Sequence, residues 1–101
     1  MNFAELRQER TRLVALQLLT QVPEYSADAG ELSRGLRGFG LSLSHDAMRT
    51  QLAWLEEQGL VVLVKASDTL QVAKLTTRGE DAAYGRAFIP GVKRPGPEDS
   101  L

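Results

Sequence analysis

Apolar residues recur at helical spacing over residues 44–58. Met48, Leu52 and Leu55 are four and three residues apart, which places them on one face of a helix. Ser44 precedes them and offers a side-chain oxygen to the unpaired N–H groups at the start of such a helix. The pattern therefore predicts a capped helix with one core-facing stripe.

The pattern changes to that of strands after Gly59, which is suited to the end of the helix. Residues 60–64 are continuously apolar and rich in valine, and residues 70–75 alternate between apolar and polar side chains. The polar residues 65–69 between them are typical of a turn. A β-hairpin is therefore expected directly after the helix.

The rest of the chain predicts three further helices. Residues 2–21 contain neither proline nor glycine, which favours a helix that ends before Pro23, and residues 24–26 are expected to be an extended connector. Two shorter helices are predicted over residues 28–37 and 77–87, because each begins with a side-chain oxygen followed three positions later by a glutamate. These pairs are Asp28 with Glu31 and Thr77 with Glu80.

Together these elements predict an α+β fold, a winged helix-turn-helix of three helices, a β-hairpin wing and a C-terminal helix. Residues 1–88 would form this single domain. Residues 89–101 contain three prolines and two glycines, so we expect an extended Pro/Gly-rich C-terminal arm with no regular structure.

The composition excludes several classes of function. The chain has 101 residues, no cysteine and one histidine, and no apolar run of the length that a membrane span requires. His45 and Asp46 are neighbours on a helix and point about 100° apart, so they make a poor catalytic pair. We expect a cytoplasmic protein that is not an enzyme, with no metal, no cofactor and no membrane partner.

Three segments resemble a known family. Residues 52–60 (LAWLEEQGL), 75–86 (LTTRGEDAAYGR) and 90–95 (PGVKRP) are similar to a family of small winged-helix proteins from Mu-like bacteriophages and prophages, and more generally to winged helix-turn-helix regulators. The resemblance spans nearly the whole chain. It implies a phage-encoded winged-helix protein in a bacterial host cell and leaves its biochemical role open.

The outward face of the helix over residues 44–58 is where such folds contact double-stranded DNA. Arg49 would bind guanine or phosphate, His45 and Thr50 would make shorter polar contacts, and Ser44 with the helix N-terminus would meet a phosphate. Further cations could neutralise phosphates. They are Arg34, Arg37, Lys65, Lys74, Lys93 and Arg94.

The charge of this helix argues against strong DNA binding by one chain. Asp46, Glu56 and Glu57 against Arg49 give residues 44–58 a net charge of −2, and the pI of the chain is about 5.8. A dedicated duplex binder usually has a pI above about 9. Two alternatives therefore stay open: a winged-helix protein-interaction module in phage assembly, and a dimer whose C-terminal arms alone grip nucleic acid.

The first helix is apolar on nearly all sides, which indicates that it is covered from more than one direction. A second subunit could supply part of this cover, so a homodimer is expected. Trp54 is either an anchor of such an interface or packs against the wing or the first helix. The residues assigned to the interface are Leu13, Leu18, Trp54, Tyr84 and Phe88.

Overall fold

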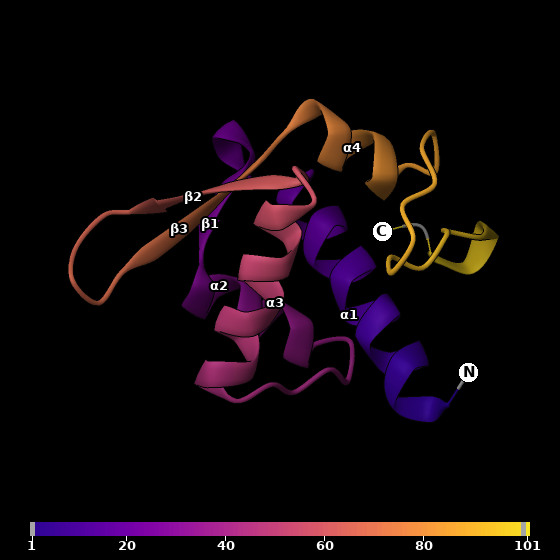
Figure 1. Ribbon diagram of the computed structural model, residues 1–101, viewed down its shortest axis with the longest axis horizontal. Coiled ribbons are helices and arrows are strands. Elements are labelled where there is room, and N and C mark those ends of the chain that lie inside the picture. Colours follow the sequence, from indigo (N-terminus) through magenta and orange to yellow (C-terminus); the bar gives the residue numbers. More distant parts are fainter. Residues whose placement is uncertain (1, 100) are drawn as a thin grey trace.

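The computed structural model describes residues 2–99 and 101. In this part of the chain, the elements run in the order α1, β1, α2, α3, β2, β3 and α4, with two short 3-10 turns. Their bounds are α1 Phe3–Leu19, the turn Pro23–Tyr25, β1 Ser26–Asp28, α2 Ala29–Arg37, α3 His45–Glu57, β2 Val61–Lys65, β3 Gln71–Leu75, α4 Thr77–Ala83 and the turn Pro97–Asp99. Figure 1 shows the β2–β3 hairpin projecting from one end of the helices and the C-terminal tail at the opposite end. The α+β winged-helix prediction is confirmed.

The helix ends follow local capping. The Ser44 hydroxyl accepts from the Ala47 N–H at 3.0 Å at the start of α3. Gly59 has a φ of 74° after its end, a left-handed conformation that favours glycine. Asp28 and Glu31 form the predicted capping box of α2.

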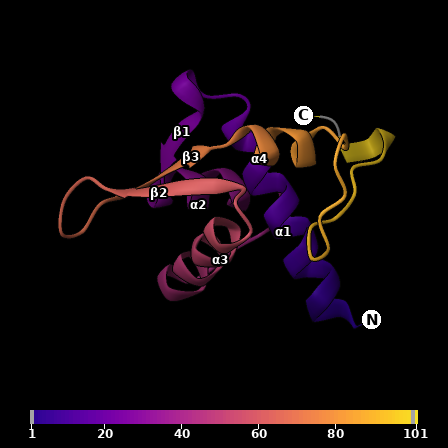
Figure 2. The same ribbon diagram turned by 45° about the horizontal axis from the view of Figure 1, so that its top comes forward.

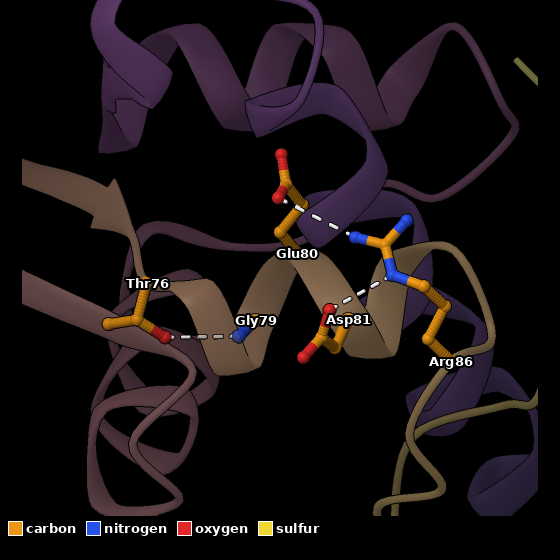
Figure 3. A network of polar contacts seen from close by, with 5 residues as sticks. All are labelled: Thr76, Gly79, Glu80, Asp81 and Arg86. Carbon is orange, nitrogen blue, oxygen red and sulfur yellow. Dashed lines mark hydrogen bonds and ion pairs between the residues drawn. The ribbon is translucent and has the colours of Figure 1, made fainter.

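The start of α4 differs from the prediction by one residue. Thr76 is the cap in place of Thr77, and its hydroxyl accepts from the Gly79 N–H at 3.0 Å (Figure 3). The helix ends at Ala83 rather than near residue 87. Arg86 lies just beyond this end and pairs with Glu80 and Asp81.

The sheet has a strand that the sequence did not predict. Its antiparallel order is β1-β3-β2, with Ala27 opposite Ala73 and Val61 opposite Leu75. The expected extended connector is a 3-10 turn that leads into β1. This third strand joins β3 to the start of α2, because Asp28 lies opposite Val72 and both ends β1 and caps α2.

The tail also differs from the expected arm. Residues 89–99 fold back onto α1 (Figures 1 and 2), where the Lys93 N–H donates to the Glu9 carbonyl at 3.2 Å. Ile89 and Val92 are buried in the same core as the leucines of α1. The physical reason is that these two apolar side chains, which lie among prolines and glycines, are removed from water by packing against the apolar face of α1.

No helix within residues 2–99 and 101 has the length and apolar character needed to cross a bilayer.

Candidate nucleic-acid interface

The core-facing stripe of α3 fixes which of its side chains are presented outward. Met48, Leu52 and Leu55 are buried, as their spacing predicts. The opposite side is exposed, together with the residues at the helix start. These exposed residues are Ser44, His45, Asp46, Arg49, Thr50, Ala53 and Glu57.

Two grooves flank the N-terminal end of α3. One, of about 480 Å³, lies between α3 and the wing and is lined by His45, Arg49 and Lys65 among others. The other, of about 260 Å³, lies between α2 and α3 and is lined by Arg34, Arg37 and His45 among others. Because His45 lines both, the structure brings these five residues onto one surface, which we name the α2–α3–wing surface.

Gln71 is a polar residue of this surface that the sequence analysis missed. It begins β3 and lines the groove between α3 and the wing. Its Oε1 atom is buried and has no hydrogen-bond partner among the described residues. A strand position with alternating polarity gave no sign of this placement, because the groove forms only when the hairpin packs beside α3.

Most cations elsewhere in the described chain already have partners. Each binds a backbone carbonyl or an acidic side chain. These pairs are Arg7 with the Gly40 carbonyl, Arg10 with the Phe39 carbonyl, Arg12 with the Gly91 carbonyl, Arg78 with the Gln58 carbonyl, Arg86 with Glu80 and Asp81, and Lys93 with Asp99. On the α2–α3–wing surface, by contrast, the side chains of Arg34, Arg37, Arg49 and Lys65 have no hydrogen-bonded or ion-paired partner within residues 2–99 and 101. No hydrogen bond or ion pair therefore holds these four side chains. The charge of Arg34 contributes, after the backbone N–H of Glu31, to the lowered pKa of Asp28, and Asp68 lines the same groove as Arg49 and Lys65.

Glu56 explains part of the acidic charge of α3. One of its carboxylate oxygens accepts from the Leu63 N–H at 2.8 Å. Leu63 lies on β2, an edge strand of the sheet. The carboxylate thus ties the last turn of α3 to the wing. Asp46 on the first turn of α3 and Asp68, which lines the groove with Arg49, remain as exposed acids beside this surface, and Glu57 is exposed at the end of α3.

The predicted tail cations are not part of the α2–α3–wing surface. The Lys93 ammonium pairs with the Asp99 carboxylate, and this bond, with that of the Gly96 N–H, holds the pKa of Asp99 below its usual value. Arg94 is exposed in the same segment. Both views place the tail across α1 from the hairpin (Figures 1 and 2), so the expected arm is docked on its own domain.

The residues expected at a subunit interface fall into different environments. Leu13 is 0% exposed, so the chain itself supplies the cover that a second subunit was expected to give, and Leu13 is not available to a partner. Leu18 is half-buried and packs against Gly35 of α2. Tyr84 and Phe88, after α4, are exposed.

Trp54 packs against α1, as one of its two interpretations expected. The Arg12 guanidinium lies 3.9 Å from the centre of the indole ring. Its Nε donates to Gln51 Oε1 at 2.8 Å, and its Nη1 donates to the Gly91 carbonyl at 2.9 Å. Partial burial lowers the pKa of Arg12. The sequence could not single out Arg12 because all its partners are distant along the chain.

No group of three or more histidine, aspartate or glutamate side chains within the described residues is placed to hold a metal ion.

Comparison with known proteins gives close relatives by sequence and similar structures at low identity. No family model matches the chain. An uncharacterized protein of Haemophilus influenzae is 40% identical over 78 residues, which cover 77% of this chain and 76% of that protein. The uncharacterized protein gp26 of Escherichia phage Mu is 42% identical over 89 residues, which cover 88% of this chain and 91% of gp26.

Solved structures of RosR from H. salinarum share the fold. One superimposes with a TM-score of 0.64 at 20% identity and covers 72% of this chain. A complex structure, RosR-S1, gives a TM-score of 0.62 at 20% identity and covers 71% of this chain. The chain spans 64% and 62% of the length of these two RosR chains. At this identity the likeness shows the winged-helix fold alone.

Proposed function

Because the chain belongs to the same family as gp26 of Escherichia phage Mu and has a winged-helix fold, we propose that it is a phage-type DNA-binding protein. It binds double-stranded DNA through the α2–α3–wing surface and acts in transcriptional regulation or in the handling of phage DNA.

The single observation that carries this proposal is the division of the cations. Four of them lie around the two grooves beside α3 without a partner among the described residues, while most cations elsewhere are held by carbonyls or carboxylates. These four are Arg34, Arg37, Arg49 and Lys65. Such an arrangement supplies phosphate contacts on both sides of a helix placed for the major groove.

The residues at the start of α3 complete the proposed contacts. Arg49 reaches a base edge or a phosphate, and His45 and Thr50 make the shorter polar contacts. Ser44 uses its oxygen to cap the helix, so the neighbouring N–H groups of the first turn, rather than the hydroxyl, would face a phosphate.

Two copies of the chain would double this modest set of cations. The proposed homodimer forms through the exposed aromatic side chains after α4, Tyr84 at 53% and Phe88 at 65% exposure. Large exposed aromatics of this kind anchor protein interfaces. Light scattering on the purified protein distinguishes a dimer, which supports this part of the proposal, from a monomer, which contradicts it.

The test of DNA binding is an anisotropy titration of a labelled duplex at about 50 mM salt. We expect wild-type protein to raise the anisotropy and Arg37→Ala to weaken binding. The matched control is Arg94→Ala, which removes the same charge from the tail and leaves affinity unchanged. No anisotropy change at tens of micromolar protein would overturn the proposal, and a loss of affinity confined to Arg94→Ala would favour a tail that grips DNA.

A second candidate function is a protein-interaction module in phage assembly. The observation that favours it is the pair of exposed acids, Asp46 and Glu57, on the same side of α3 as Arg49. An Arg49→Ala variant separates the two proposals. Weaker duplex binding supports contact of DNA by α3, and unchanged affinity supports the interaction module.

A further inference from the structure

Arg12 joins three segments that are far apart in the sequence. Its guanidinium stacks on Trp54 and donates to Gln51, both on α3, and to the Gly91 carbonyl of the tail. We infer that the docked tail acts as a clip, which means that it holds the side of α3 that carries Gln51 and Trp54, opposite the proposed DNA face. Arg12 is the positioning residue through which the docked tail orients α3 for DNA. This inference rests on the proposed DNA-binding function.

The first argument is that the tail is docked by several independent contacts. Ile89 and Val92 are buried against the helices. The Gln17 side-chain amide donates to the Asp99 carbonyl at 2.6 Å, and the Lys93 N–H donates to the Glu9 carbonyl at 3.2 Å. Within the tail itself, the Asp99 carboxylate accepts from the Gly96 N–H at 2.7 Å and pairs with Lys93. The prolines of this segment restrict the undocked chain, which lowers the entropy lost on docking.

The second argument is the fit between Gly91 and the Arg12–Trp54 pair. Gly91 has a φ of 95°, in the left-handed region that favours glycine. A Cβ at this position would lie 2.6 Å from Trp54 Cζ2 and 3.2 Å from Arg12 Nη1. The tail backbone therefore lies so close to Trp54 of α3 that no side chain fits at position 91.

The third argument is where these contacts lie on α3. Gln51 is a buried polar residue at 8% exposure, and the bond from Arg12 is the one that its Oε1 receives. Thr50 and Ala53 are exposed on the proposed DNA face and lie beside Gln51 and Trp54 in sequence. A small rotation of α3 that breaks the Arg12 contacts would therefore move the outward face as well.

Coupling of this kind is reciprocal. If the docked tail favours the orientation of α3 that binds DNA, then DNA must favour the docked tail by the same factor. The tail would then act on affinity without touching the nucleic acid. This separates the clip from an arm that supplies charge, because the two make opposite predictions for Arg12 and Arg94.

The experiment compares Arg12→Met with Arg94→Met in duplex titrations over a range of salt concentrations. Both variants lose one positive charge. We expect Arg12→Met to weaken binding about 5-fold or more, in line with typical coupling energies, with the slope of log affinity against log salt unchanged. Loss of a phosphate contact would instead reduce that slope by about 1. Arg94→Met is expected to match the wild type.

A second variant keeps the test valid if Arg12→Met does not fold. Gly91→Ala places a methyl group against Trp54 and leaves every cation in place. Trp54 is the only tryptophan, so its fluorescence emission reports directly on its contacts with Arg12 and Gly91. We expect a red shift of emission in Gly91→Ala and weaker duplex binding, and neither change in Arg94→Met.

The outcomes separate this inference from the proposed function. If the wild type binds duplex, and Arg12→Met and Gly91→Ala bind it with the same affinity, the clip is wrong and the DNA-binding proposal stands. A reduced salt slope for Arg12→Met also overturns the clip, since Arg12 would then contact phosphate. If the wild type does not bind duplex at all, the proposed function fails and the inference fails with it.

Discussion

Glu56 and Glu57 are neighbours at the end of α3, and the structure gives them different roles. The Glu56 carboxylate accepts from the Leu63 N–H of the wing, whereas Glu57 is exposed and has no hydrogen-bond partner among the described residues. Replacing each by Ala and by Gln therefore tests whether the bond to the wing contributes to stability. Gln keeps an oxygen acceptor and removes the charge, and Ala removes both.

The expected magnitude follows from an exposed hydrogen bond to an ionised acceptor. Its loss in Glu56→Ala costs about 1 kcal/mol of unfolding free energy, which corresponds to a fall in Tm of about 4–8 °C for a domain of this size. Glu56→Gln should fall between Ala and wild type. At position 57 both variants should unfold at or slightly above the wild-type temperature, because no hydrogen bond is lost and a negative charge at a helix C-terminus is unfavourable.

Thermal and urea unfolding, followed by circular dichroism, give these values. The reasoning is refuted if the Ala and Gln variants at position 56 unfold alike, or if position 57 shows the larger difference. The duplex affinity of the two Ala variants gives a second test, because the two explanations predict changes of opposite sign for Glu56→Ala. Removal of a negative charge alone predicts tighter binding for both Ala variants, whereas a displaced wing predicts weaker binding for Glu56→Ala only.

Further predictions concern the packing of α4, the tail and α2. Gly79→Ala should lower the unfolding free energy by more than about 2 kcal/mol, because a Cβ would lie 2.1 Å from the Leu60 carbonyl oxygen. In urea unfolding, Gly96→Ala should stay near wild type, because its Cβ would make only an ordinary contact with Asp99 Oδ2 at 3.6 Å. The pKa of Asp99 is lowered by its bonds to Lys93 and the Gly96 N–H, so its stabilisation is present above the usual carboxylate range near about 4 and is lost as the pH falls through the lowered value. Asp99→Asn should flatten this acid limb of stability, and an unchanged limb would contradict the role of the pair. In duplex titrations, Arg34→Ala should weaken binding and Arg86→Ala should not, since Arg86 is already paired.

The sequence predicted the elements whose signals are local. The Ser44 cap, the Asp28–Glu31 capping box and Gly59 lie within a few residues of the ends that they define. The apolar stripe of α3 also fixed its outward face, and with it the candidate contact residues. Capping chemistry and helical periodicity involve near neighbours only, so a single sequence contains them.

The remaining features depend on contacts between distant segments. The strand β1 forms because it pairs with β3. Its three residues are too few to show a strand pattern in the sequence. The tail has the composition of a flexible arm, and its contacts with α1 and with Trp54 of α3 form only when the chain has folded. Arg12 looked like any other cation of the first helix, because Gln51, Trp54 and Gly91 meet it only in the folded chain.

The salt dependence of duplex binding tests the central claim most directly. If Arg34, Arg37, Arg49 and Lys65 each neutralise a phosphate, log affinity should fall with log salt at a slope of about −3.6 per chain. The affinity of one chain would then drop about 150-fold between about 50 and 200 mM salt, and more steeply for a dimer. An affinity that does not change over this range, or no binding at the lower salt concentration, would contradict a DNA-binding α2–α3–wing surface.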